Sequence, residues 1–402
     1  TIDTDRYVAV LSGGYGAARG VGSALFLVDL EDTITNGGTI YGGDENNGPI
    51  KIVDINTEKI VGGSVIERDI HNSVPTDPIV ITPDTFKGVS WRGAMVYLND
   101  FEGKITKINL TNQKSENNDV NLYDQTTIYN LGATNANERF SYFGMDAAYG
   151  SDTRNLWLFG ATGDFSDIGG KQKGMDNILY GLRDRDFPFF RHSANGKIPS
   201  PVTIDTATQV ASLNSEFVKK ALLVAENAPH VDDLNVCARS RDDGGSCLGS
   251  IKEGWVFQLD KPFGDKSIDG EVGSSPNKYR KASASPTVFN GMVYYPVYEP
   301  PEGDKKCNVG KAFICSANDE CGTNTSKKIA YKQKSVRLES GFDENSGCYY
   351  IQPGILSKLV IFGNKLFANV TTDSDKQEDT LVTLLGDEGE ISVYRGSWRE
   401  NY

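Results

Sequence analysis

The feature that most constrains the fold is a succession of short β-type runs, separated by turn residues along the whole chain. Most runs hold four to seven residues, are rich in Val, Ile, Phe and Tyr, and stop at Gly, Asn or Asp. They cover residues 7–11, 24–30, 50–55, 94–98, 105–110, 156–159, 255–259, 292–297, 358–362, 365–370, 381–385 and 391–394. The 43 glycines among 402 residues exceed average usage and suit a chain with many tight turns. We therefore predict an all-β protein.

One passage fits two structures. Val210, Leu213, Phe217 and Val224 follow a helical spacing, but residues 222–224 equally fit a buried strand. The sequence leaves both open.

A loose repeat favours a particular β architecture. Apolar strands that end in Asp or Asn recur at residues 25–29, 50–54, 105–109 and 255–260. This pattern is typical of the inner strands of β-propeller blades, where the terminal side chain caps the next turn. At roughly 40–50 residues a blade the length allows about eight to ten blades, and long polar insertions reduce this to about seven. We predict a single all-β domain over residues 1–402, a β-propeller of about seven irregular blades. Two packed sheets would use short strands too, but they would not explain the repeat.

The six cysteines indicate an oxidising compartment. All lie between residues 237 and 348, none forms a CxxC pair, and only three histidines are present, so no zinc spacing occurs. Three disulfides explain them better than free thiols. Although six cysteines allow fifteen connectivities, short loops favour Cys237–Cys247 and Cys315–Cys321, which leaves Cys307–Cys348. The long insertions would then be tied by disulfides.

The charge balance excludes some functions. With 54 acidic and 41 basic residues the net charge is −13, which argues against sequence-independent nucleic-acid binding and against docking to anionic membranes. No run approaches 18 apolar residues, so we expect no membrane insertion. Thr1 opens the chain without a signal-peptide pattern, and we expect a mature or excised fragment.

Two motifs imitate catalytic or nucleotide sites. Glycines 13–22 lack the strand–helix context of a dinucleotide fingerprint, and a tight turn explains them better. Residues 245–249, Gly-Ser-Cys-Leu-Gly, imitate a nucleophile elbow, but Cys247 has a nearby disulfide partner in Cys237. No triad, HExxH or Walker loop is visible, so we predict no catalytic residues and no enzyme.

Four segments lie in a fixed order along the chain: residues 96–110, 158–165 with 180–184, 254–259 with 284–294, and 397–400. Together they resemble the PilC/PilY family of type IV pilus tip-associated adhesin and biogenesis proteins. Residues 96–110 (VYLNDFEGKITKINL) are similar to its "VYxGDxxGxLWxxDL" strand pair. Residues 158–165 (LFGATGDF) with 180–184 (YGLRD) resemble its "fGTG…YGixD" segment. Residues 254–259 (GWVFQL) with 284–294 (ASPTVFNGMVY) resemble "GWyldL…sxPvvfxgxVyf", and residues 397–400 (SWRE) resemble its ending.

The resemblance implies the C-terminal β-propeller of a pilus biogenesis factor and tip adhesin, without the N-terminal adhesive region. Its implied partners are minor pilins and the major pilin filament tip, with a surface or host receptor as a further ligand. Its implied location is extracellular, at the pilus tip or outer cell surface, reached through the periplasm. A quinoprotein-like periplasmic enzyme or a ligand-binding propeller is the alternative, although four tryptophans are too few to dock every blade.

Calcium is the cofactor that the resemblance implies, held in a loop just before the "VYxGD" strand. Residues 86–94 correspond to that loop and contain no carboxylate, so the expected calcium site looks degenerate. The best remaining metal candidates are Asp373, Asp375 and Asp379. An acidic, solvated hairpin tip explains these three residues equally well.

Overall fold

The structure, a computed structural model, is built from strands and their connections. It describes residues 7–16, 22–30, 40–41, 50–51, 59–61, 64–66, 73–82, 92–111, 125–150, 155–184, 186–190, 254–260, 278–302, 309–320, 322, 330–331, 348–363, 365–371 and 381–385. Within these ranges there is no helix, so the all-β prediction is confirmed. The described part of the chain accordingly contains no helix that could cross a membrane.

The strands form five larger antiparallel sheets and one small hairpin. The first sheet contains β1 (Val8–Ser12), β2 (Ala24–Asp29), β3 (Ile40–Tyr41) and β4 (Ile50–Lys51). The second contains β7 (Ile79–Ile81), β8 (Gly93–Asn99), β9 (Lys104–Thr111) and β10 (Gln125–Asn130). The third contains β11 (Asp146–Tyr149), β12 (Leu156–Ala161), β13 (Ile178–Asp184) and β14 (Gly254–Gln258). The hairpin is β5 (Lys59–Val61) with β6 (Ser64–Ile66).

In the last two sheets, one strand pairs out of chain order. The fourth contains β15 (Lys281–Ala282), β16 (Thr287–Phe289), β17 (Met292–Glu299), β18 (Lys311–Asn318) and β20 (Cys348–Pro353). The fifth contains β19 (Ala330–Tyr331), β21 (Ile355–Leu356), β22 (Val360–Phe362), β23 (Lys365–Thr371) and β24 (Leu381–Leu385). Strand β19 precedes β20 in the chain but pairs with β24 of the fifth sheet.

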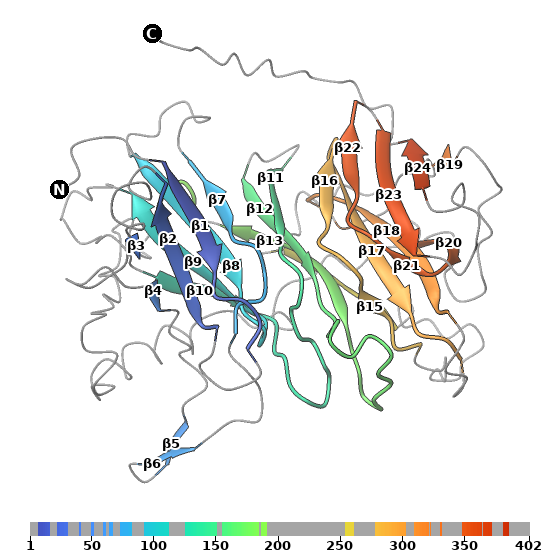
Figure 1. Ribbon diagram of the computed structural model, residues 1–402, viewed down its shortest axis with the longest axis horizontal. Coiled ribbons are helices and arrows are strands. Elements are labelled where there is room, and N and C mark those ends of the chain that lie inside the picture. Colours follow the sequence, from blue (N-terminus) through green and yellow to red (C-terminus); the bar gives the residue numbers. More distant parts are fainter. Residues whose placement is uncertain are drawn as a thin grey trace.

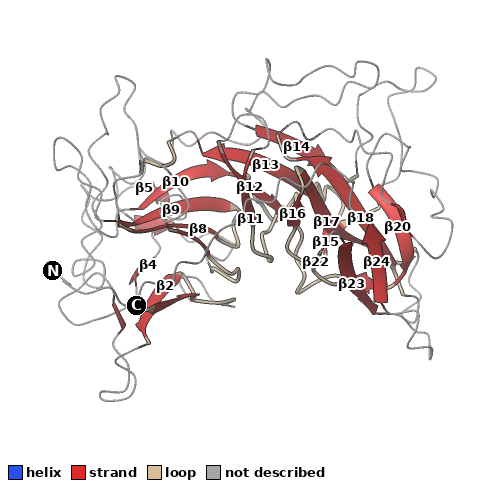
Figure 2. Cartoon of the chain, turned by 90° about the horizontal axis from the view of Figure 1, so that it is seen from above, coloured by secondary structure: helices blue, strands red, loops and turns tan. Residues whose placement is uncertain are grey.

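The five sheets follow one another along an arc in chain order, with the first and fifth sheets at its two ends (Figures 1 and 2). In the second and third sheets the strands pair in simple chain order, as in a meander. The described residues form five larger sheets. The β-propeller architecture, its count of about seven blades and the single-domain assignment stay predictions.

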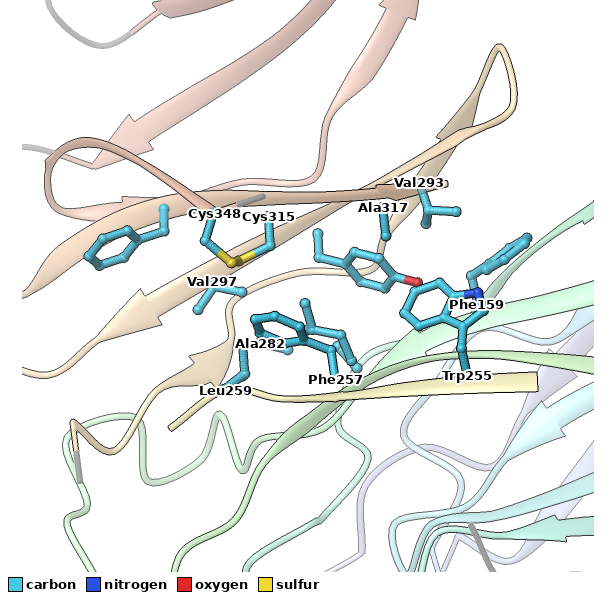
Figure 3. Close-up of a cluster of buried hydrophobic side chains, with 14 of the residues drawn as sticks. Phe159, Trp255, Phe257, Leu259, Ala282, Val293, Val297, Cys315, Ala317 and Cys348 are labelled. Carbon is cyan, nitrogen blue, oxygen red and sulfur yellow. A yellow bond between two sulfur atoms is a disulfide. The ribbon is translucent and has the colours of Figure 1, made fainter. Parts of the chain in front are cut away.

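Sheet-on-sheet packing explains why an interior strand such as β12 is apolar on both faces. In β12, Leu156 and Leu158 face the second sheet, whereas Trp157 and Phe159 face the fourth. Because side chains alternate along a strand, a sheet between two neighbours buries both of its faces. Figure 3 shows the core between the third and fourth sheets. Strands β2 and β23 alternate between buried and more exposed residues, and among the described sheets each packs on one neighbour.

The disulfide in the described residues corrects the expected pairing. Cys315 of β18 bonds to Cys348 of β20, its direct partner in the antiparallel register. The predicted pairs Cys315–Cys321 and Cys307–Cys348 are therefore wrong. The pairing of β18 with β20 places Cys348 directly opposite Cys315, so the bond follows from strand register and not from a short loop. Cys237, Cys247, Cys307 and Cys321 lie outside the described residues.

Candidate functional site

The residues that carry the sequence resemblance pack against one another. An added Cβ at Gly160 would lie 2.1 Å from the Tyr180 hydroxyl oxygen, because that ring crosses the bare backbone of β12. A Cβ at Gly181 would lie 2.5 Å from the Trp255 indole nitrogen for the same reason. Each glycine thus makes room for an aromatic ring from the neighbouring strand, in the register Gly160↔Tyr180 and Gly181↔Trp255.

The same rings connect the third sheet to the fourth. Trp255 and Tyr295 meet edge to face with ring centroids 6.1 Å apart. The Tyr295 hydroxyl donates to the Tyr180 carbonyl oxygen at 2.9 Å, and the Trp255 indole N–H donates to the Asp319 carbonyl oxygen at 2.9 Å. Aromatic contacts with a satisfied polar tip are strong anchors in a core. These motif residues therefore hold adjacent sheets together.

A buried charge cluster connects the second sheet to the third. The Lys107 ammonium lies 2.7 Å from a carboxylate oxygen of Asp184, which also accepts a hydrogen bond from the Tyr97 hydroxyl at 2.6 Å. The Lys107 and Asp184 side chains are almost completely buried. Burial, followed by the charge of Asp184, raises the pKa of Tyr97 well above its usual value. This tyrosine therefore stays protonated and serves as a hydrogen-bond donor.

A second buried cluster lies between β14 and β17. The Arg280 guanidinium donates to Glu299 at 2.8 Å, and its Nη1 lies 3.9 Å from a carboxylate oxygen of Asp260. The backbone N–H groups of Lys278 and Arg280 also donate to the Asp260 carboxylate. Burial nevertheless raises the pKa of Asp260 to about 6, because it outweighs these favourable contacts.

These clusters are inaccessible to a ligand. The motif side chains Tyr97, Tyr180, Asp184, Trp255 and Tyr295 are each less than 5% exposed. A group that binds substrate or a partner must reach it, so their chemistry serves the scaffold. Recognition must come from the loops and edges around them.

One line of backbone hydrogen bonds joins the loops of the first four sheets. We name these six bonds the intersheet line: Gly14 N–H to Val74 O, Val74 N–H to Gly22 O, Phe101 N–H to Ser73 O, Ser141 N–H to Phe101 O, Gly163 N–H to Phe140 O, and Ala282 N–H to Thr162 O. Their donor–acceptor distances run from 2.6 to 3.1 Å. The line keeps loops from different sheets in register.

Six aromatic rings gather on this line and form the best candidate for a recognition surface. The cluster consists of Tyr15, Phe101, Phe140, Tyr142, Phe143 and Phe165. Tyr142 is central, with ring centroids 5.7 Å from Tyr15, 5.5 Å from Phe143 and 5.8 Å from Phe165. Phe101 and Phe140 are buried beneath, whereas Tyr15 is 44% exposed. Loops that hold half-exposed rings in this way can contact flat apolar groups of a partner.

Charged groups lie beside these rings. Lys281 donates to the Asp167 carbonyl oxygen and interacts electrostatically with Glu138, Asp167 and Asp164. Burial lowers the pKa of Lys281 against the opposing effect of those carboxylates, and burial also raises the pKa of Glu138. The loops between β10 and β11 and between β12 and β13, which carry most of these residues, hang below the sheets in Figure 1.

The predicted metal residues cannot be compared with this arrangement. Asp373, Asp375 and Asp379 lie outside the described residues, as do residues 86–91 of the expected calcium loop and the imitation elbow at 245–249. Within the described ranges no three His, Cys, Asp or Glu side chains are grouped to hold a metal. The glycine-rich stretch lies between the paired strands β1 and β2, and Gly13 N–H donates to Ala24 O at the end of this pair.

Sequence reasoning missed a repeat that the structure reveals. Three serines precede strands in successive sheets. Ser73 lies before β7 of the second sheet, Ser141 before β11 of the third, and Ser283 before β16 of the fourth. Each follows a basic residue by two positions: His71, Arg139 and Lys281. Ser73 and Ser141 belong to the intersheet line, and the Ser283 hydroxyl donates to Leu356 O of the fifth sheet at 2.9 Å. The same basic-x-Ser pattern also occurs at residues 191–193 and 395–397, so by itself it does not identify the sheet starts.

Comparison with known proteins gives a structural likeness. No model of a known family matches the sequence, and no curated protein matches it. Among solved structures, the chain is similar to the C-terminal domain of PilY1 from Pseudomonas aeruginosa, with 12% sequence identity and a TM-score of 0.45. The likeness covers 94% of this chain and 68% of that one. That protein bears the name of the family that the four sequence segments resemble.

Proposed function

We propose that this chain is a C-terminal β-propeller module of the PilC/PilY type and works without turnover in type IV pilus assembly and tip adhesion. The observation that carries the proposal is the order of the four family-like segments in the sequence. Contacts between their characteristic residues support it: Tyr97 with Asp184, Tyr180 with Gly160, and Trp255 with Gly181. Residues that recur together in a sequence signature are expected to share one structural task.

In this proposal the family-like sequence segments build the scaffold, and the loops bind the partners. The partners are minor pilins at the filament tip, with a surface or host receptor as a further ligand. The protein acts outside the cell, after passage through the periplasm. Loop contacts with a protein partner need no reacting group, which fits charged clusters that are buried and paired.

The decisive experiment removes the gene from its own bacterium and counts surface pili by electron microscopy, together with adhesion to a surface. We expect both to fall and to return when the wild-type gene is restored. Restoration with a variant lacking residues 229–252 should leave adhesion or piliation reduced, provided that the protein is still secreted. Unchanged piliation and adhesion in the deletion strain would overturn the proposal, and so would quinone-dependent dehydrogenase turnover by the purified chain.

A further inference from the structure

The buried pair of Lys107 and Asp184 has a geometry that suits a reaction between the two side chains. Nζ of Lys107 lies 2.7 Å from Oδ2 of Asp184, and the side chains are 0% and 2% exposed. Nζ also lies 5.7 Å and 6.0 Å from the ring centroids of Tyr97 and Phe187, and it donates to the Phe189 carbonyl oxygen at 2.5 Å. An amine nitrogen and a carboxyl carbon are therefore held next to each other, away from water.

The two carboxyl oxygens of Asp184 have different partners. Oδ1 accepts the backbone N–H groups of Asp186 and Phe187 at 2.9 and 3.3 Å. Oδ2 accepts the Tyr97 hydroxyl at 2.6 Å and faces the lysine. Two backbone donors on one oxygen are the arrangement that stabilises an oxyanion during acyl transfer. A hydroxyl on the other oxygen is placed to protonate that oxygen as it departs.

We propose that Lys107 and Asp184 condense to an amide, a covalent cross-link between β9 of the second sheet and β13 of the third. The reaction joins one ammonium and one carboxylate and releases one water, so it needs no oxidant, reductant or other co-reactant. The ion pair described above is the state before condensation. The inference is independent of the function proposed above.

Burial removes the main obstacle to this reaction. In water, hydration stabilises the ammonium and the carboxylate, and an ammonium nitrogen has no lone pair with which to attack. Keeping two charges out of water is costly, so transfer of one proton from Nζ to Oδ2, which leaves a neutral amine and acid, costs less here than in water. The amide that forms carries no charge at all.

The amine and the acid can then react with every group in place. The Nζ lone pair attacks Cγ of Asp184, and the C–O π electrons move to Oδ1, where the N–H groups of Asp186 and Phe187 bind the charge. The Tyr97 hydroxyl passes its proton to the departing Oδ2 and takes a second proton from Nζ, so it ends unchanged. The Cγ–Oδ2 bond breaks, water leaves, and Oδ1 becomes the amide oxygen.

Two other charged pairs each lack one of these conditions. Lys278 lies 2.6 Å from Glu302, but these side chains are 30% and 73% exposed, so both ions stay hydrated. Arg280 and Glu299 are buried, but a guanidinium keeps its charge and offers no amine lone pair. The first of these pairs serves as an internal control.

Mass spectrometry of the whole 402-residue chain, denatured and with its disulfides reduced, tests the proposal. The wild-type protein should be lighter than its sequence by the mass of one water molecule, because an amide survives denaturation and an ion pair does not. Trypsin should release one branched peptide that joins residues 105–114 to residues 184–185, since the modified Lys107 is not cleaved. The peptides that contain Lys278 and Glu302 should stay unlinked.

Two variants separate the amine from its surroundings. Lys107→Arg keeps a positive charge opposite Asp184 but brings no amine, so it should have the full mass of its sequence and give no branched peptide. Tyr97→Phe keeps the ring beside Nζ and removes the hydroxyl. In samples taken at successive times after synthesis, it should condense at least roughly 100-fold more slowly than the wild type. Thermal unfolding confirms that each variant is folded.

Several results would overturn the proposal. A wild-type chain with the full mass of its sequence would leave Lys107 and Asp184 as an ion pair only. A loss of water that persists in Lys107→Arg would exclude the cross-link too, and unbranched peptides would then indicate a succinimide, for example at Asp243-Gly244. Equal rates for the wild type and Tyr97→Phe would contradict the part given to the hydroxyl. The wild-type mass and the branched peptide decide the proposal even where a variant does not fold.

Discussion

At the scale of single residues, the structure gives a physical reason for charges that the sequence places in apolar strands. Lys107 of β9 and Asp184 of β13 are 77 residues apart in sequence, yet they pair inside the junction of two sheets. The carboxylate also accepts N–H groups from Asp186 and Phe187, which fixes the chain after β13. A buried pair gives little net stability compared with apolar residues, but removal of one partner leaves the other charge stranded.

We predict that Asp184→Asn lowers the free energy of unfolding by about 3–5 kcal/mol, because the Lys107 ammonium then stays buried without a counter-charge. Urea unfolding measures this change. Lys278→Ala is the control: Lys278 pairs with Glu302 at 2.6 Å, but both side chains are solvated, and this variant should change stability little. Equal effects of the two substitutions would show that the Lys107–Asp184 pair is not desolvated.

Asp260 predicts a dependence of stability on pH. Its folded-state pKa of about 6 lies above the ordinary value of 3.8, so between these values the folded state binds more protons than the unfolded state. The contribution of this group is therefore full below about pH 4 and is lost as the pH rises through about 6. The stability of the wild type minus that of Asp260→Asn should fall by about 3 kcal/mol between pH 4 and 7. A difference that is flat, or that rises with pH, contradicts the burial of this carboxyl.

The sequence could predict some of these residues and not others. Apolar runs, turn glycines and the motif glycines are local signals. The match of Gly160 to Tyr180 and of Gly181 to Trp255 depends on strand register, which spans long insertions that the sequence does not measure. The same limit explains the wrong cysteine pairing, since Cys315 and Cys348 meet across a strand pair with a sequence separation of 33.

At the scale of elements, the intersheet line is the feature that joins separately formed hairpins. Within a sheet, most strands pair with strands that are close in the chain, whereas Ser73, Phe101 and Ser141 lie in three different connections. The Phe101 N–H donates to Ser73 O, and the Ser141 N–H donates to Phe101 O. The strands were predictable because period-two apolar runs and turns define them. The line was not, because its residues lie in loops with no periodic pattern.

Substitutions at Ser141 separate its backbone role from its side chain. The Ser141 N–H donates to Phe101 O at 3.1 Å, whereas its hydroxyl is buried with no hydrogen-bond partner among the described residues. Ser141→Pro removes the donor and should cost roughly 1–3 kcal/mol of unfolding free energy. Ser141→Ala should be neutral or slightly stabilising, because it removes an unsatisfied buried hydroxyl. If both variants unfold at the same urea concentration, this bond contributes nothing measurable.

At the scale of the whole molecule, stability should follow position along the arc. The third and fourth sheets bury both faces in two separate cores, whereas the first sheet contributes only one face to a smaller core. All-β packing was foreseeable from composition and strand pattern. Which of the described sheets lie at the ends of the arc was not, because the pattern of β2 is that of an interior strand and only the arrangement in Figure 2 places its sheet last among the described ones.

This gradient predicts the order of amide hydrogen exchange. Local opening costs less where few apolar contacts are broken, so amides of β1, β2 and β22 should exchange first. Amides of β12, β13, β17 and β18 should be protected at least roughly tenfold more, which corresponds to about 1.4 kcal/mol of opening free energy. Peptide-resolved exchange with mass spectrometry measures the order. Uniform protection across the five sheets would mean that the first sheet is as well covered as the interior ones.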